Sequence, residues 1–470
     1  MENFWDYNVW GWMMLFAVLL ASMLAGNVLK RAIPLLQRSL IPTSVLGGVI
    51  LLVIAAIYKG ITGDVMFDTM LFGGNGTANL EIITYHALAL GFIASTFKST
   101  NTKLTKKRSG EIFDTGVTTV STYLLQAIFG FGITMIVALV IDGFFAAAGM
   151  LLPFGYGQGT GQALNYGTIY EVENGCVGGK SFGLTIAALG FLSASIGGVI
   201  HLNIMRKRGR LVLSERTDGS LHSEDLETDG EIPMQESIDK LTVQIALIVV
   251  AYVLAYGLMA LLGTLLPGMK SVIYGFNFLL GVMTAMLIKL SLNFLRKKGI
   301  MKKKYTNNFL MTRTSNFFFD LMVVAGVAAI RLDILEKNWG VMLILGVVGM
   351  LITYIYNRIV AKVLFRDYAE EQFLMMYGML TGTASTGVIL LREVDGEFKT
   401  PASDNLVYQN LPAIAFGFPM MFLATLAPVR PMLTMIIFVA FFAVMNVMLF
   451  RRQIFRRKRK TDDATKEEDK

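Results

Sequence analysis

The chain is dominated by long apolar runs separated by short polar segments. Eleven of these runs have roughly the 17–25 residues that an α-helix needs to cross a bilayer. They are 9–29, 40–58, 82–97, 115–141, 181–204, 238–266, 271–295, 314–330, 339–364, 406–426 and 431–450. Two further stretches, 143–170 and 372–391, are apolar but rich in Gly, Thr and Ser, and are too broken for ordinary spans. The pattern predicts an all-α polytopic membrane protein.

The distribution of Lys and Arg predicts the topology. Of the 42 basic residues, 35 fall on one side of the membrane and six on the other if both broken stretches enter and leave on the same side. Since cytoplasmic loops are enriched in basic residues, the N-terminus is expected outside and the C-terminus in the cytoplasm. The two broken stretches are then re-entrant segments. The first run follows acidic residues and precedes Lys30 and Arg31, the reverse of a cleaved signal peptide.

The order of segments repeats in the two halves of the chain. Each half has four spans, a glycine-rich stretch and a fifth span, so we expect repeats at 1–204 and 238–426. The acidic segment 205–237 is interpreted as a solvated cytoplasmic linker, and 427–470 as an extra transmembrane helix with a basic tail. Residues 156–163 and 377–384 agree at five of eight positions. Because one half begins outside and the other inside, the repeats are inverted, as in many secondary transporters.

Composition excludes several classes of protein. Charged residues make up 16% of the chain, against about 25% in soluble domains, so a soluble chain of this kind would leave its surface uncovered. One cysteine, Cys176, and three histidines provide neither an internal disulfide nor a metal cluster. The chain has no phosphate-binding loop of the ATPase type. We therefore expect no enzyme activity and no bound cofactor.

The glycine-rich stretches are the best candidates for a binding site. Glycines stand at every second position from 155 to 161, a pattern that an uninterrupted helix rarely carries. Unwound tips at 157–161 and 381–386 would offer backbone N–H groups to a carboxylate, and carbonyls and hydroxyls to Na⁺. The candidate binding residues in the tips are Gly157, Gln158, Gly159, Thr160, Gly161, Thr381, Gly382, Thr383, Ser385 and Thr386. We place the Na⁺ site at Thr160, Thr381, Ser385 and nearby carbonyls. The alternative is that these small residues only allow close helix packing.

Polar residues outside the tips have competing explanations. Asn165 would cap or line the first tip, and Asp320 is either a functional carboxylate or a structural partner of a neighbouring helix. Arg392 is either a ligand for a substrate carboxylate or a cytoplasmic anchor. His86 is interpreted as a neutral, hydrogen-bonded histidine, with a proton relay as the alternative. Lys289 is expected to extend toward the inner membrane surface.

The chain resembles the bacterial sodium/glutamate symporter family over nearly its full length. Residues 157–163 match the family motif Gly-His-Gly-Thr-Gly-Ala-Ala, with Gln158 in place of His and Gln162 in place of one Ala. Residues 41–48 are similar to its Ile-Pro-Glu-Pro-Val-Ala-Gly-Gly without the Glu and the second Pro, and residues 381–387 lack the Pro of the second re-entrant motif.

This resemblance implies Na⁺-coupled uptake of glutamate across the cytoplasmic membrane. It also implies a homodimer in which a core domain with both re-entrant hairpins moves against a scaffold, as in an elevator. The sequence alone leaves two alternatives open. One is a transporter of another small carboxylate, and the other is an ion channel with re-entrant loops.

Overall fold

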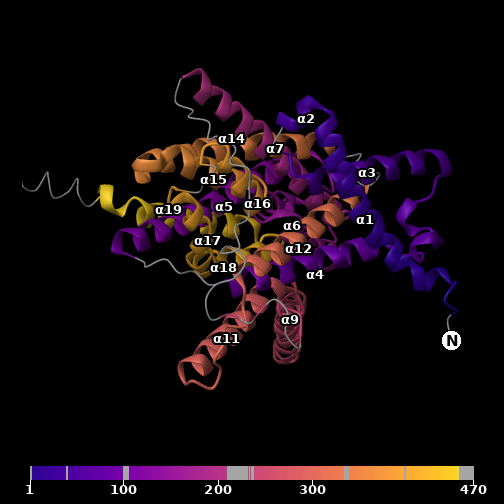
Figure 1. The fold of residues 1–470 in the computed structure, drawn as a ribbon. Helices are drawn as coiled ribbons and strands as arrows, with labels where there is room; N and C mark the ends of the chain where they lie inside the picture. The colour runs from indigo at the N-terminus through magenta and orange to yellow at the C-terminus, as the bar shows by residue number, and fades with distance from the viewer. Residues whose placement is uncertain are drawn as a thin grey trace, which may run out of the picture. The chain divides into compact units, whose positions relative to one another are not determined.

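A computed structural model describes residues 3–38, 41–98, 105–208, 231, 233, 238–332, 338–395 and 399–454. Within these ranges the secondary structure is helical apart from one isolated β-bridge between Glu231 and Lys304 (Figure 1). Among the described residues, nine helices are long and apolar enough to cross a membrane, or ten if the bent pair Ala402–Tyr408 and Pro412–Leu426 forms one span. The chain is therefore an all-α, multi-pass membrane protein, as the sequence predicts.

The helices form two compact units, and each unit contains segments from both halves of the chain. The first unit comprises 1–103, 159–188 and 216–337, and the second comprises 104–158, 189–215 and 338–470. These units are defined by which helices pack together. They differ from the two inverted repeats, which remain a prediction from the sequence.

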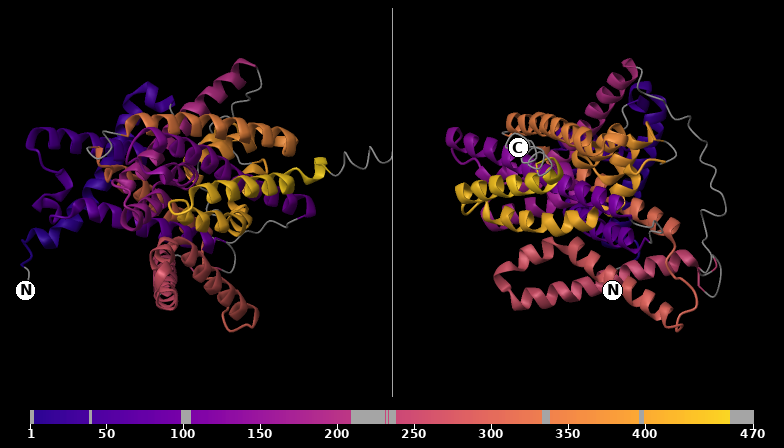
Figure 2. Two further views of the ribbon diagram at one scale, coloured as in Figure 1. Left: turned by 180° about the vertical axis from the view of Figure 1, so that it is seen from behind. Right: turned by 90° about the vertical axis from the view of Figure 1, so that its left-hand side faces the viewer.

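The first unit is built around α4 and α12. Its helices are α1 (Tyr7–Ala32), α2 (Pro34–Arg38), α3 (Thr43–Thr62), α4 (Gly76–Phe97), α9 (Lys240–Leu265), α10 (Lys270–Gly275), α11 (Asn277–Lys297) and α12 (Asn308–Ala328). Helix α4 packs along α12 and α11, and α3 packs on α1 and α12. The side chain of Ser315 donates to the carbonyl of Gly91, where α4 and α12 approach closely. Figure 2 shows α9 and α11 as neighbouring helices.

The second unit is built around α5 (Lys106–Val140). Its other helices are α14 (Trp339–Leu364), α15 (Ala369–Thr381), α16 (Ala384–Arg392), α17 (Ala402–Tyr408), α18 (Asn410–Leu426) and α19 (Pro431–Leu449). Helix α5 contacts α14, α18 and α19, and α15 packs between α14 and α16. Two helices have residues in both units: α6 (Leu151–Asn174) and α7 (Gly179–Lys207).

Local sequence signals set several helix ends. Asp239 accepts from the backbone N–H groups of Leu241 and Thr242, which start α9. Asn307 caps α12 in the same way through the N–H of Leu310. Helix α3 ends at Thr62, and the residue that caps it is Gly63, whose positive φ of 80° is easily adopted by glycine alone.

Three sequence expectations need correction. The run 271–295 is two helices, because the helix is interrupted between Gly275 and Asn277. The run 314–330 forms α12, which starts at Asn308, but its polar residues keep it out of the group of nine apolar helices. Most of the predicted linker 205–237 lies outside the described residues. Glu231 does not fit the solvated interpretation, because its side chain is 2% exposed and pairs with Lys240 at 2.9 Å and Lys304 at 3.2 Å.

Candidate substrate and ion site

The first glycine-rich stretch is a helix with an unwound residue in its middle. Helix α6 is interrupted at Gly159, where φ is 77° and ψ is −170°. This combination is essentially restricted to glycine, because a Cβ would clash with the backbone. The break falls inside the predicted tip 157–161. It is also the residue at which the chain passes from the second unit to the first.

Residues before this break are held within the second unit. The hydroxyl of Tyr123 donates to the carbonyl of Gly157 at 3.0 Å. A Cβ at Gly157 would lie 2.0 Å from the Tyr123 ring, so only glycine fits there. Tyr156 is fully buried and donates to the carbonyl of Gly346 at 2.6 Å. Gln158 is partly exposed.

Residues after the break are held within the first unit. Thr160 is fully buried, and its hydroxyl donates to the carbonyl of Met322 in α12 at 3.2 Å. Gly161 packs directly on Leu88 of α4, without room for a Cβ. Asn165, which follows the first tip, donates to the carbonyl of Gly275 at 2.9 Å. It therefore stabilises the break between α10 and α11.

The second glycine-rich stretch is also a broken helix, entirely within the second unit. Helix α15 ends at Thr381, Gly382 has φ of −139° and ψ of −103°, and α16 begins at Ala384. The hydroxyl of Thr381 donates to its own helix at Tyr377, 2.6 Å away. Thr383 and Thr386 share a long hydroxyl contact of 3.4 Å. The predicted tip 381–386 therefore contains a real interruption of the helix.

The structure brings only part of the predicted site together. Thr381, Thr383 and Thr386 gather at the second break, whereas Thr160 belongs to the other unit. The backbone of Ser385 lies in α16, but its side chain lies outside the described residues. The joint Na⁺ site at Thr160, Thr381 and Ser385 therefore stays a prediction.

Asp320 lies beside the motif 41–48 in the first unit. Its side chain is partly buried and lies near Ser44 at the start of α3, but the Ser44 hydroxyl makes no hydrogen bond within the described residues. Next to it Gly48 packs on Val327 of α12, again without room for a Cβ. The sequence singled out both features but gave no sign that they meet.

The other polar candidates have simpler environments. Arg392 is exposed in the last turn of α16, where a cation complements the helix dipole. His86 is hydrogen-bonded through Nδ1 to the hydroxyl of Tyr252 at 2.7 Å, which confirms the expected hydrogen bond. Lys289 donates to the carbonyls of Thr96 and Lys98 at the end of α4, and so caps that helix.

Sequence reasoning missed a third break and a buried polar seam. At the break between α10 and α11, Tyr85 donates to the carbonyl of Tyr274 at 2.7 Å, and Asn277 donates to that of Tyr85 at 3.0 Å. The seam follows α5 in the second unit and includes Thr115, Thr118, Thr119, Thr122 and Gln126, all buried. Their spacing of three or four residues places them on one side of a helix, a signal that was available in the sequence.

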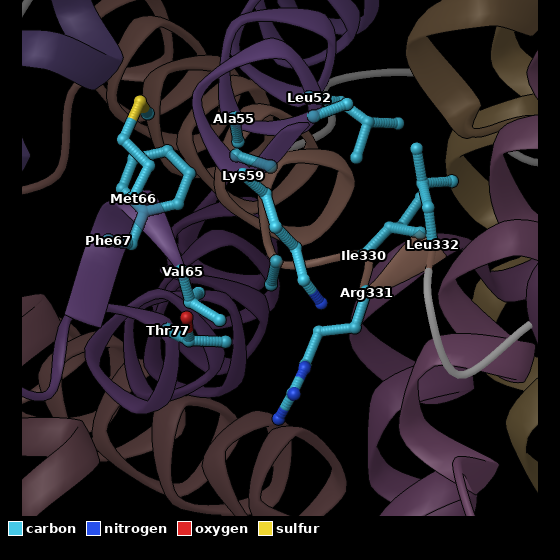
Figure 3. Close-up of a pocket in the computed structure, with 13 residues that line it drawn as sticks. Leu52, Ala55, Lys59, Val65, Met66, Phe67, Thr77, Ile330, Arg331 and Leu332 are labelled. Atoms are coloured by element: carbon cyan, nitrogen blue, oxygen red, sulfur yellow. The ribbon is translucent and has the colours of Figure 1, made fainter. Parts of the chain in front are cut away.

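A small cavity of about 60 Å³ lies between α3, α4 and the end of α12. Figure 3 shows Lys59 extending from α3 toward Arg331, with Thr77 on the opposite wall. The rest of the lining is largely apolar, including Leu52 and Ile330. None of these residues was a sequence candidate, and the cavity has room for only a few water molecules.

Comparisons with known proteins leave the family unassigned. No group of three or more His, Cys, Asp or Glu side chains suited to a metal ion occurs among the described residues. No protein-family model matches the chain, and no curated protein matches it either.

Proposed function

We propose that this protein is a secondary active transporter that couples uptake of glutamate, or a similar small acidic amino acid, to the Na⁺ gradient. The observation that carries the proposal is the pair of broken helices. Each predicted glycine-rich tip contains a helix break, at Gly159 and at Gly382–Thr383. Backbone groups at such breaks are costly in a membrane unless protein surrounds them or they line a cavity, and in transporters such breaks form substrate and ion sites.

The chemistry of the breaks supports a small anion with a cation. Broken membrane helices in transporters present N–H groups to substrate carboxylates, while carbonyls and hydroxyls bind Na⁺. The second break offers the hydroxyls of Thr383 and Thr386 beside unwound backbone. Alternating access by an elevator-like movement, in a homodimer of the cytoplasmic membrane, belongs to the same proposal and is suggested by the family resemblance.

Reconstituted protein provides the direct test. We expect proteoliposomes to accumulate radiolabelled glutamate when an inward Na⁺ gradient is imposed, and to lose this accumulation when choline replaces Na⁺. Unlabelled aspartate and other small dicarboxylates, added as competitors, would define the substrate. Uptake that is independent of the gradient for every acidic amino acid would contradict the proposal. Single-channel currents in planar bilayers, without saturable uptake, would identify a channel instead.

A further inference from the structure

Four fully buried polar side chains meet between α5 and α14 in the second unit. They are Thr122, Gln126, Thr353 and Asn357, and each is at most 1% exposed. Gln126 Nε2 donates to the hydroxyl of Thr353 at 2.8 Å, and Asn357 Nδ2 donates to the hydroxyl of Thr122 at 3.4 Å. Because Thr122 and Gln126 are one turn apart on α5, and Thr353 and Asn357 one turn apart on α14, the four form one cluster, here called the amide cluster.

Two oxygens of the amide cluster have no hydrogen-bond partner among the residues that the structure describes. They are Oε1 of Gln126 and Oδ1 of Asn357. The amide nitrogens fix the orientation of both groups. Gln126 Nε2 also donates to the carbonyl of Leu380 at 2.9 Å, and Asn357 Nδ2 donates to the carbonyl of Thr353 at 2.9 Å. A buried acceptor without a donor costs about 1–3 kcal/mol, so a bound cation would stabilise both oxygens.

The end of a helix adds negative potential at the same place. Leu380, which accepts from Gln126, is the penultimate residue of α15, just before the break at Gly382. The last carbonyls of a helix lack intrahelical partners and carry the negative end of its dipole. The cluster therefore combines amide and hydroxyl oxygens with a helix C-terminus and contains no carboxylate. Such a neutral set of oxygens suits a monovalent cation better than a divalent one, which usually requires carboxylates.

We propose that the amide cluster binds Na⁺ through Oε1 of Gln126 and Oδ1 of Asn357, next to the C-terminal end of α15. The cation would fix the segment just before the second break, because Gln126 holds both an ion ligand and the carbonyl of Leu380. Cation binding itself follows from the cluster. Its identification as the coupling-ion site rests on the proposed transport function.

Thermal unfolding of the purified full-length protein tests cation binding without transport. We expect NaCl to raise the melting temperature of the wild type saturably, relative to choline chloride at equal ionic strength. The near-isosteric variants Gln126→Met and Asn357→Leu should each raise the Na⁺ concentration for half of the shift at least tenfold. Asn357→Asp, which adds a charge, should lower that concentration and provides a readout if an apolar variant fails to fold.

Asn405→Leu is the matched control. Asn405 is also a fully buried amide of the second unit with an unpartnered oxygen, but its Nδ2 donates to Tyr368 and to Gln372, each at 3.0 Å. It should keep the Na⁺ dependence of the wild type. Equal stabilisation by NaCl and choline chloride, as expected if only water fills the cluster, would overturn the proposal. So would a wild-type Na⁺ dependence in both apolar variants.

The transport assay separates the two proposals. If the Na⁺ shift is lost in the apolar variants but the wild type accumulates no acidic amino acid, the cation site stands and the proposed function fails. If Na⁺-driven uptake is present and unchanged in Gln126→Met and Asn357→Leu, the function stands and the amide cluster is not the coupling site.

Discussion

Single residues determine where the two glycine-rich helices break. At Gly159 the backbone itself requires glycine, since φ is 77° and ψ is −170°. At Gly382 φ is negative, and the constraint is spatial, because a Cβ would lie 2.9 Å from the Thr386 hydroxyl. The same residue type therefore serves two different physical purposes at the two breaks.

We predict that Gly159→Ala abolishes Na⁺-driven uptake while the protein is still produced. An alanine in this backbone region costs about 1–3 kcal/mol, so the break would shift or the helix would rewind locally. Uptake into proteoliposomes and the yield of folded protein on size-exclusion chromatography are the two measurements. Gly257→Ala is the matched control, since a Cβ there meets no atom within 4 Å. Uptake by Gly159→Ala at the control's rate would contradict a functional break.

The charged group before the second break has its own pH dependence. Glu370 accepts from Arg358 through both oxygens at 2.5 Å and from His201 at 2.9 Å. Burial opposes ionisation of this carboxyl, but the hydrogen bonds from His201 and Arg358 outweigh it and lower the pKa of Glu370 from 4.5 to about 2. The ionised carboxylate therefore stabilises the fold above pH 4.5, and this stabilisation is lost as the pH falls through about 2.

We predict that Glu370→Gln lowers the free energy of unfolding at pH 7 by about 1–2 kcal/mol. The full pKa shift corresponds to about 3 kcal/mol, which solvent screening of a partly exposed group reduces. Thermal unfolding of both proteins from pH 7 to pH 3 measures the effect. The difference in the free energy of unfolding between wild type and variant should begin to decrease below pH 4.5. A difference that stays constant over this pH range would show that the Glu370 charge does not contribute to stability.

At the scale of elements, the unexpected result is the position of α19. The sequence pattern predicts it as an extra transmembrane helix after two repeats, but α19 packs along α5 within the second unit. Tyr356 of α14 donates to Asn446 of α19 at 2.9 Å. Just after the helix, Arg451 donates to Asp114 at 2.6 Å and stacks over the ring of Phe113. Helix α19 is thus part of the folded unit.

We predict that Arg451→Met and Asp114→Asn are strongly coupled. The Asp114 side chain is 8% exposed, so each single variant leaves a poorly solvated polar group behind. A double-mutant cycle on the free energy of unfolding should give a coupling of about 1–3 kcal/mol. The exposed pair Lys107 and Asp367, 3.1 Å apart, is the control and should give less than about 1 kcal/mol. Equal coupling in both pairs would contradict the anchoring role of Arg451.

At the scale of the whole molecule, the basic residues make the topology testable. Lys270 and Lys298 are exposed residues at opposite ends of the segment that contains α10 and α11. The charge distribution places Lys270 outside and Lys298 in the cytoplasm. Cys176 is the only native cysteine. Its burial and the nearby Glu171 raise the pKa of its thiol to about 12, so it reacts slowly with maleimides.

We predict that, in a Cys176→Ser background, a membrane-impermeant maleimide labels Lys270→Cys on intact cells. In the same background, Lys298→Cys should be labelled only after the membrane is permeabilised. Mass shift on a denaturing gel gives the readout, with the Cys176→Ser protein as the blank. Labelling of Lys298→Cys on intact cells would reverse the predicted orientation.

The sequence predicted most of the helices and both central interruptions, because apolar run length and glycine position are local properties. It failed where partners come from distant segments. The break at Gly275 is stabilised by Tyr85 and Asn165, which lie far away in the chain. The capping of α4 by Lys289 and the pairing of the buried Glu231 with Lys304 likewise depend on long-range contacts.

The sequence by itself therefore determined that this is a polytopic helical membrane protein with two glycine-broken segments. Hydrophobic length and glycine geometry act within a few residues, so they can be read from the chain directly. Only the tertiary structure decided which helices share a unit, and that Gln126 meets Thr353 beside the end of α15 while Asn357 meets Thr122. Such meetings depend on packing between residues more than 200 positions apart, for which a single sequence carries no local signal.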